Sequence, residues 1–297
     1  MTTGRNAQGK DQAAKIKIID AVCNFRTPEV VARRKHEWVL YNQQFHKIED
    51  VMTMDQLIQK MDAAGIEKAF LISVKMGSKY NGLSDLCIRD EEVAEAVRKY
   101  PKRFYGLAGF DPYEGMGGVR ALEYAIKELG FIGAHVYPHW FGLEPDHRKY
   151  YPFYTKCVEL DIPIQMQVGQ CQIYIKDFPP LRSVGRPITL DTIACDFPEL
   201  KLIGIHTGWP WVEEMISVAK KHPNVYIGSD AYAPKYWTSE FIHFINSWGR
   251  DKVIFGTDSP VIDMERAVQE IEELNLRPDS KRKFMSENVI RVYNLKE

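Results

Sequence analysis

Residues 201–211, KLIGIHTGWPW, contain the change from strand to helix that decides the fold. A short apolar strand is expected at Leu202–Ile205, and it leads directly into His206. A glycine and a proline then turn the chain toward the helical pattern that begins near Trp211. A histidine at the carboxyl end of a buried strand, followed at once by a turn, occupies the position where α/β proteins place their chemistry.

The stretch Lys252–Pro260, KVIFGTDSP, repeats this arrangement, with Asp258 directly after a strand. Outward from these two stretches, strand patterns alternate with helical patterns along the whole chain. The eight strands are expected at Lys17–Val22, Lys68–Val74, Phe104–Phe110, Phe131–Tyr137, Pro163–Val168, Lys201–His206, Val225–Ser229 and Lys252–Gly256. The helices are expected at Met54–Ala64, Glu91–Lys99, Gly118–Leu129, Phe153–Leu160, Leu190–Asp196, Val212–Lys221, Glu240–Trp248, Met264–Leu274 and Ser280–Val289.

Strand–helix units in this order predict an α/β protein, a (β/α)₈ TIM barrel. The alternative is an open doubly wound sheet, which is less favoured because no GxGxxG motif follows a strand. Thr53 and Asp90 precede the first two helices and are expected to cap them. Two long excursions, Arg26–Val51 and Gln170–Ile188, would then lie on the face of the barrel that carries the active site.

Composition excludes several classes of protein. The chain has 297 residues, with 39 Lys and Arg against 40 Asp and Glu, and this balance does not favour nucleic-acid binding. Its five cysteines contain no CxxC, so a reducing, cytoplasmic location is expected. Residues 1–14 are polar and are expected to form a flexible tail before a single domain at 15–297. No apolar run is long enough to cross a membrane.

Four stretches resemble one family: GIHTGWPW, HPNVYIGSD, FGTDSP and GFIGAHVYPHWFG. They resemble the amidohydrolase superfamily, and within it the amidohydrolase-related branch around aminocarboxymuconate-semialdehyde decarboxylase. The resemblance runs from Lys17 to Leu295 and implies a TIM barrel. It also implies a hydrolase, hydratase or decarboxylase (a carboxy-lyase) and, commonly, a homodimer.

Members of this family usually hold a divalent metal, often zinc. Its ligands are a His-x-His after strand one, a His after strand five and an Asp after strand eight, and another His after strand six works beside it. His206 matches the His after strand six, and Asp258 matches the Asp after strand eight. The other positions differ: Val22–Asn24 replaces the His-x-His, and Gln167 replaces the strand-five His. Amide oxygens bind zinc poorly. The sequence therefore predicts no cofactor, although Asp258 and His206 with two amides could form a weak site for a hard cation.

His206 and Asp258 are accordingly the candidate catalytic residues, His206 as general acid or base and Asp258 as its orienting or proton-accepting partner. Candidate substrate-binding residues are Asn24, His135, His139, Gln167, Arg182 and Arg186. The two arginines could hold a carboxylate. The two histidines would share one side of strand four if that strand continued. Each residue also has a structural interpretation: a buried core histidine, a turn-capping Asp, or an arginine that faces water.

The expected reaction is either loss of CO₂ from a small carboxylate or hydrolysis of a small lactone. Two alternatives stay open: a non-catalytic barrel that serves as a binding or scaffold protein, and a metal-dependent hydrolase with an atypical ligand set. The other histidines fall in helices or polar loops and are expected at the surface: His36, His46, His147, His222 and His243.

Overall fold

The computed structural model describes residues 16–33, 51–80, 86–173 and 180–296. Within them, eight strands form one parallel sheet in the order β1-β2-β5-β6-β7-β8-β9-β10. These strands are β1 Ile19–Asn24, β2 Lys68–Ile72, β5 Phe104–Gly109, β6 Gly133–Val136, β7 Ile164–Gln167, β8 Leu202–Ile205, β9 Val225–Gly228 and β10 Val253–Ile254.

The last strand returns to the first. The amide of Ala21 donates to the carbonyl of Phe255 over 3.0 Å, and the amide of Asp258 donates to the carbonyl of Val22 over 2.8 Å. These bonds close the sheet, so the predicted TIM barrel is confirmed and an open sheet is excluded. All eight predicted strands are present with small shifts at their ends.

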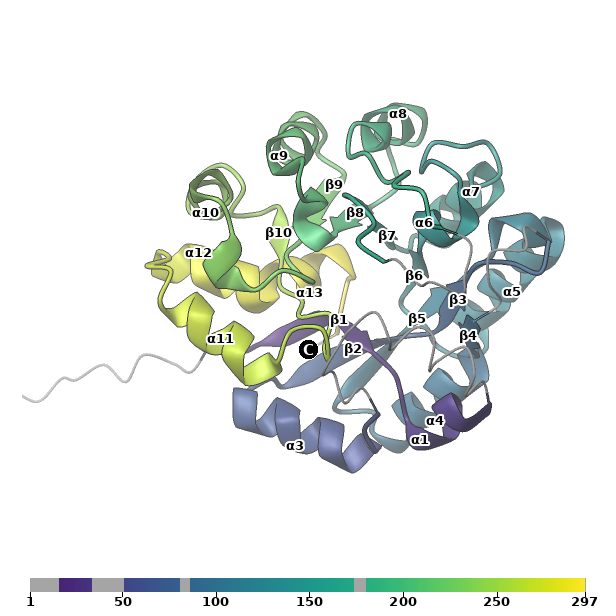
Figure 1. The fold of residues 1–297 in the computed structure, drawn as a ribbon, viewed down its shortest axis with the longest axis horizontal. Coiled ribbons are helices and arrows are strands. Elements are labelled where there is room, and N and C mark those ends of the chain that lie inside the picture. The colour runs from purple at the N-terminus through teal and green to yellow at the C-terminus, as the bar shows by residue number, and fades with distance from the viewer. Residues whose placement is uncertain (1–15, 34–50, 81–85, 174–179, 297) are drawn as a thin grey trace, which may run out of the picture.

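The helices form a ring outside the strands (Figure 1). They are α3 Met54–Ala64, α4 Asp90–Lys99, α5 Met116–Lys127, α7 Tyr151–Glu159, α8 Thr189–Asp196, α9 Val212–Lys221, α10 Ser239–Ile245 and α11 Met264–Glu272. The predicted last helix is instead divided into α12 Pro278–Arg282, a π-helical turn at Lys283–Glu287 and α13 Asn288–Val292.

Short elements that were not predicted include α1 Pro28–Arg33, the antiparallel pair β3 Val74–Met76 and β4 Leu86–Ile88, and α6 Pro138–Phe141. The last one corrects the expectation for strand four, which ends at Val136 instead of continuing through His139. Pro138 has no amide to donate to a sheet and its fixed φ suits the first position of a helix, so the chain turns there.

One of the two predicted helix caps is confirmed. The Thr53 hydroxyl accepts a bond from the amide of Gln56, as the N-cap of α3. The prediction for Asp90 is wrong, because Arg89 takes the cap position and Asp90 lies in the first turn of α4. The Asp90 carboxyl instead accepts a bond from the Ser73 hydroxyl, which ties α4 to the end of β2.

The strands are buried on both faces. Every residue of β1, β8 and β9 is buried, as expected for parallel strands enclosed by helices, and this explains why they read as nearly continuous apolar runs. Tyr293, in the turn that ends α13, packs edge-on against Phe70 of β2 at a centroid distance of 4.9 Å. The C-terminal segment thus completes the core.

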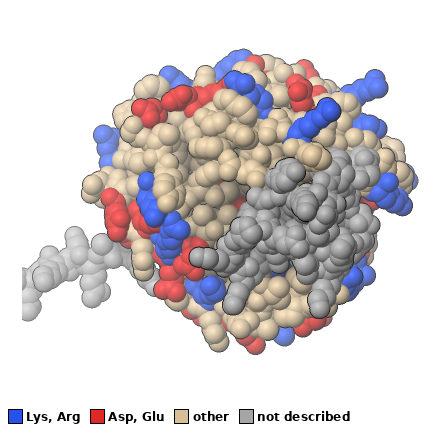
Figure 2. Space-filling model, in the orientation of Figure 1, with Lys and Arg blue, Asp and Glu red and all other residues tan. Residues whose placement is uncertain are grey.

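The predicted tail at residues 1–14 and most of the Arg26–Val51 excursion lie outside the described residues, as do His36 and His46. On the face shown in Figure 2, basic and acidic side chains are intermingled over the described residues. In the same part of the chain, no helix has both the length and the apolar character needed to cross a bilayer.

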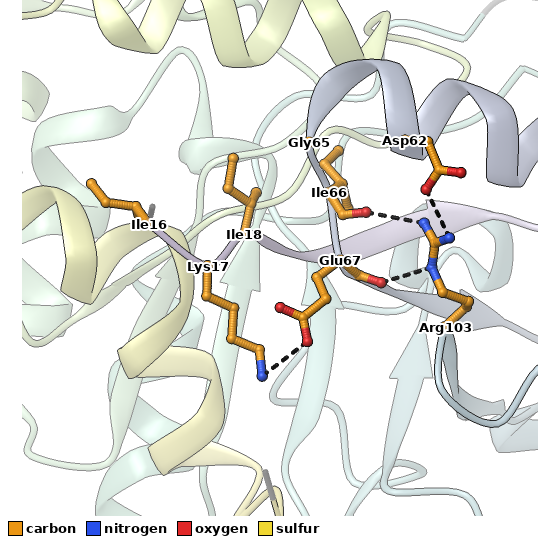
Figure 3. A pocket seen from close by; sticks show the side chains of 8 residues that line it. All are labelled: Ile16, Lys17, Ile18, Asp62, Gly65, Ile66, Glu67 and Arg103. Atoms are coloured by element: carbon orange, nitrogen blue, oxygen red, sulfur yellow. Dashed lines mark hydrogen bonds and ion pairs between the residues drawn. The ribbon is translucent and has the colours of Figure 1, made fainter. Parts of the chain in front are cut away.

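The amino ends of β1, β2 and β5 surround a hollow whose charged groups pair with one another (Figure 3). Arg103 forms an ion pair with Asp62 at 2.8 Å and donates to the carbonyls of Ile66 and Glu67. Lys17 lies 3.3 Å from the Glu67 carboxylate. This end of the barrel is therefore a structural junction, and the candidate site lies at the opposite end.

Candidate active site

The two loops that carry His206 and Asp258 have unusual backbone conformations. His206 follows β8 with φ of 67°, and Thr207 after it has φ of 53°. Asp258 follows β10 with φ of 57°. Residues other than glycine adopt this left-handed region at a cost of about 1–3 kcal/mol, and such strain clusters at functional sites. Both side chains lie at the carboxyl ends of strands, where TIM barrels place their active sites.

A third side chain joins them. Asp230, two residues after β9, is 1% exposed, and its Oδ1 accepts a bond of 3.1 Å from the amide of His206. His206 Nε2 lies 3.3 Å from Asp230 Oδ2 and 3.8 Å from Asp258 Oδ2. These are ion-pair distances without hydrogen-bond geometry. The ligand atoms of the three residues all lie within 4.8 Å of one another, close enough to share one metal ion.

Two amide side chains border this cluster. Asn24 Nδ2 donates to Asp258 Oδ1 over 2.7 Å, and Gln167 Nε2 lies 3.1 Å from His206 Nδ1. If the Gln167 amide donates to Nδ1, the ring proton is on Nε2 and faces the two carboxyl groups. The structure thus brings together four residues named from the sequence, Asn24, Gln167, His206 and Asp258.

Burial dominates the electrostatics of the cluster. It raises the pKa of Asp230 and of Asp258, and the Asp230 charge raises the pKa of Asp258 further. The His206 charge acts in the opposite direction on Asp258 but does not restore its ordinary pKa. Burial also lowers the pKa of His206. The cluster therefore favours fewer charges than its three groups carry in water, and it retains a proton near neutral pH.

Asp230 was not among the sequence candidates. The signal that could have found it is the one used for His206, a polar residue just after a buried strand. Asp is also common in ordinary turns, so the sequence alone does not single this residue out.

Asp20 holds the loop that carries Asp258. It is fully buried in β1 and accepts bonds from the amide and hydroxyl of Thr257 and from the amide of Val22. Burial raises the pKa of Asp20 to about 7. Asp20 therefore acts through Thr257 on the position of the next residue, Asp258.

Arg26 also lies close to the cluster and was not predicted as a site residue. It is 5% exposed, and its positive charge lowers the pKa of Asp258, against the effect of burial. A buried guanidinium at the carboxyl end of β1 is well placed to interact with anions.

His135 and His139 are both buried, on β6 and α6. Burial lowers the pKa of His135 to about 3 and that of His139 to about 4, and the His206 charge contributes to both shifts. His139 Nδ1 lies 3.2 Å from both the Arg182 carbonyl and the Val184 amide. Neither Nε2 atom has a hydrogen-bond partner among the described residues.

The two predicted carboxylate-binding arginines are not brought into the cluster. Arg186 forms a forked ion pair with Glu214, with Nη2 to Oε2 at 2.8 Å and Nε to Oε1 at 3.1 Å. Its guanidinium also lies 4.6 Å from the ring centroid of Trp211, so it connects the loop after β7 to α9. Arg182 is exposed, and it contacts His139 through its backbone carbonyl.

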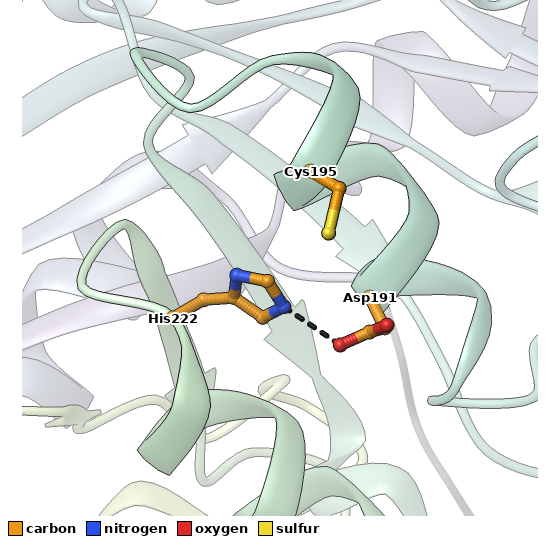
Figure 4. Close-up of side chains that lie close together, drawn as sticks. All are labelled: Asp191, Cys195 and His222. Atoms are coloured by element: carbon orange, nitrogen blue, oxygen red, sulfur yellow. Dashed lines mark hydrogen bonds and ion pairs between the residues drawn. The ribbon is translucent and has the colours of Figure 1, made fainter.

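A second group with metal-ligand atoms lies outside the barrel, formed by Asp191, Cys195 and His222 (Figure 4). Asp191 Oδ1 lies 2.7 Å from His222 Nε2 and 2.6 Å from Lys221 Nζ. These contacts explain the group as an ion pair between α8 and the end of α9. The prediction that His222 lies at the surface is wrong, because this contact leaves it only 8% exposed.

A profile of the amidohydrolase family (Amidohydro_2) matches residues 87–295. The chain belongs to this amidohydrolase family. The resemblance noted in the sequence is thereby confirmed, and the protein is an enzyme of the family, a hydrolase or a decarboxylase.

Curated relatives of this amidohydrolase-family chain include a gamma-resorcylate decarboxylase from Polaromonas sp.. The two are 24% identical over 288 residues, covering 81% of this chain and 87% of the relative. A 2-keto-4-carboxy-3-hexenedioate hydratase from Sphingobium sp. is 33% identical over 136 residues, 39% of this chain and 38% of that protein.

Solved structures agree on the fold. A TIM-barrel protein from Bordetella bronchiseptica superimposes with a TM-score of 0.75 at 24% identity, covering 94% of this chain and 99% of that one. A 5-carboxyvanillate decarboxylase from Novosphingobium aromaticivorans, complexed with manganese, superimposes with a TM-score of 0.72 at 20% identity, covering 97% and 98%.

Proposed function

We propose that this protein is a carboxy-lyase that removes CO₂ from a small aromatic or conjugated carboxylate at the cluster of His206, Asp230 and Asp258. The observation that carries the proposal is the cluster itself: one buried and one partly buried carboxyl group face one imidazole at the carboxyl ends of barrel strands. The family and the decarboxylase relative, which aligns with 81% of the chain, support this reaction class.

The donor set suits an oxygen-preferring divalent cation such as Mn²⁺. Two carboxylates and one imidazole are ligands that Mn²⁺ accepts. Asp230 Oδ2 is a buried atom without a hydrogen-bond partner in the described part of the chain, and a cation would satisfy it. The sequence-based prediction of no cofactor did not count Asp230, which adds a charged ligand. Solved relatives that contain manganese support the same choice.

His206 Nε2, Asp230 and Asp258 would hold this cation. The ring proton of His206 would then lie on Nδ1 and be donated to the carbonyl oxygen of the Gln167 amide, turned over for that contact. Bound there, the cation would offset the charge of the two carboxylates and polarise an oxygen of the substrate. The side chains of the protein must provide the other steps of the reaction. Decarboxylation requires a new C–H bond at the carbon that carries the carboxylate. The C–C bond then breaks, its electron pair returns to the conjugated system, and CO₂ leaves.

The cluster can supply that proton. His206 Nε2 lies within 4 Å of both carboxyl groups, so a proton can pass among the three groups. In the absence of the cation, burial raises the pKa of both carboxyl groups and lowers the pKa of His206, which favours a carboxyl group as the site of this proton. A proton from water restores the acid after CO₂ has left. General acid catalysis of this kind contributes about 10²–10⁴-fold to a rate.

The test is CO₂ release from a panel of hydroxybenzoates by Mn²⁺-loaded protein. We expect turnover by the wild type and a loss of about 10²-fold or more in His206→Asn. His243→Asn, a change of an exposed histidine on α10, is the matched control and should stay within about twofold of wild type. Absence of turnover across the panel, or equal rates in both variants, would contradict the proposal.

Addition of water to a conjugated carboxylate is the second candidate. It is favoured by the Sphingobium hydratase, which has the higher identity to this chain over a shorter segment. The two reactions differ in a simple readout, because hydration removes the absorbance of the conjugated double bond without releasing CO₂.

A further inference from the structure

A chain of hydrogen bonds crosses the barrel interior below the catalytic cluster. Gln165 on β7 donates from Nε2 to the carbonyl of Ala21 on β1 over 2.7 Å. The other end of the same amide, Oε1, lies 3.1 Å from His135 Nδ1 on β6. Gln165 and His135 are each at most 1% exposed, so water does not compete for these contacts.

This chain fixes which nitrogen of His135 carries the proton. The Ala21 carbonyl can only accept, so it holds the amino group of the Gln165 amide and turns Oε1 toward His135. Oε1 also can only accept, so His135 Nδ1 must donate. In the neutral ring, Nε2 is then left with an unprotonated lone pair. Because burial lowers the pKa of His135 to about 3, the ring does not take a second proton at neutral pH.

The lone pair on Nε2 has no donor among the described residues. A buried acceptor without a partner costs about 1–3 kcal/mol, which an apolar side chain at this position would avoid. The ring lies near the catalytic cluster, because its partner Gln165 is two residues before Gln167 on the same face of β7. The ring also packs on Tyr137 at a centroid distance of 4.4 Å. His135 is not part of the metal-ligand group of His206, Asp230 and Asp258. A hydrogen-bond donor therefore fits Nε2 better than the cation does.

We propose that His135 Nε2 accepts a hydrogen bond from a hydroxyl group of the substrate, and that Gln165 is a positioning residue that fixes His135 as an acceptor. The substrate class is thus a carboxylate that also carries a hydroxyl group. The carboxylate part rests on the proposed function, whereas the hydroxyl part rests on the contacts of His135 alone.

Two measurements test this without relying on turnover. The first is the ¹⁵N NMR spectrum of the histidine rings at neutral pH, assigned with His135→Phe. We expect His135 to be neutral and protonated on Nδ1 in the wild type. In Gln165→Met, which removes the amide at similar size, we expect a mixture of the two neutral forms. A wild-type ring protonated on Nε2 overturns the proposal.

The second measurement is calorimetric binding of 2-, 3- and 4-hydroxybenzoate and their methoxy counterparts to Mn²⁺-loaded protein. A methoxy group has no proton to donate, so the best-bound hydroxybenzoate should bind the wild type at least about tenfold more tightly than its methoxy counterpart. In His135→Phe the two should agree within about twofold.

An unchanged preference in His135→Phe, equal affinities in the wild type, or no binding of any probe overturns the proposal. The two proposals fail separately. Protein that shows the Nδ1-protonated ring and the hydroxyl preference but releases no CO₂ contradicts the proposed function alone. Turnover that is unaffected by His135→Phe and shows no hydroxyl preference contradicts the role of His135 alone.

Discussion

Single residues in this barrel gain unusual properties mainly because they are buried. Asp20 shows this most simply, because its contacts are complete and it touches neither the cluster nor solvent. Three hydrogen bonds stabilise its charged form, yet burial still raises its pKa from 3.8 to about 7. A carboxyl group with a raised folded-state pKa releases its proton more readily in the unfolded chain.

The consequence is a pH dependence of stability with a defined sign. Between about pH 4 and 7 the unfolded state binds fewer protons at Asp20 than the folded state does, so stability falls as pH rises. In Asp20→Asn this contribution disappears. We expect the free energy of unfolding of the variant, relative to wild type, to increase by up to about 4 kcal/mol from acid to neutral pH.

Urea unfolding at about pH 4.5, 6 and 8 measures this difference. Asp161→Asn, which changes a largely exposed carboxylate paired with Lys201, should show no comparable trend. A constant difference between wild type and Asp20→Asn at all three pH values would contradict the assignment.

The residues of the site were predictable to different degrees. His206 and Asp258 were found because each follows an apolar strand and begins a turn. In a barrel, a residue with this pattern lies at the carboxyl end of a strand, where the active site is. Asp230 has the same pattern but resembled an ordinary turn residue. The contact of His135 with Gln165 could not be predicted, because strand order and register, not sequence spacing, place their side chains together.

The elements that support the site depend on close backbone approach. Gly169, after β7, has φ of 94°, and a Cβ atom there would lie 2.4 Å from the carbonyl of Trp209. Its amide donates to the Gly185 carbonyl over 2.7 Å, and the amide of Gln170 donates to Trp209 over 2.8 Å. These contacts join the loop that follows Gln167 at the end of β7 to the loop that begins with His206 after β8.

Gly169→Ala should therefore destabilise the protein and displace the site. We expect a loss of about 2–4 kcal/mol in the free energy of unfolding, since both backbone strain and a steric clash are introduced. The matched control is Gly117→Ala in α5, where a Cβ atom meets nothing within 4 Å and alanine is favoured by about 0.5–1 kcal/mol. Chemical denaturation should separate the two alanine variants, and equal stabilities would contradict the argument.

Strand and helix positions were largely predictable because hydrophobic periodicity determines them. The short α6 was not, because VYPHWF reads as apolar whether it continues the strand or turns into a helix. The prediction for the C-terminal helix was also incomplete. The predicted helix at Ser280–Val289 misses the π-helical turn, whose extra residue per turn has no signature in apolar spacing.

At the scale of the whole molecule, the C-terminal segment completes the barrel. Asn288 is 1% exposed and donates from Nδ2 to the carbonyls of Arg250 and Val253, each over 2.8 Å. It thus joins α13 to the last strand. Asn288→Ala should lower the free energy of unfolding by about 1–3 kcal/mol, because two carbonyl acceptors, one of them buried, lose their donor.

Asn288→Asp should cost more than Asn288→Ala, since it directs a carboxylate at two carbonyl oxygens. Thermal unfolding of the three proteins gives the order directly. A change below about 0.5 kcal/mol in Asn288→Ala would show that the C-terminal segment does not depend on this contact. The expected homodimer stays a prediction, which light scattering can test.

The central claim is that His206, Asp230 and Asp258 act together as one cation-binding catalytic centre. The most direct measurement is Mn²⁺ binding by calorimetry to chelator-treated protein. The account predicts one ion per chain, with affinity reduced at least about tenfold in Asp230→Asn and in Asp258→Asn and unchanged in Asp161→Asn. Absence of binding to the wild type, or equal affinity in all four proteins, would contradict it.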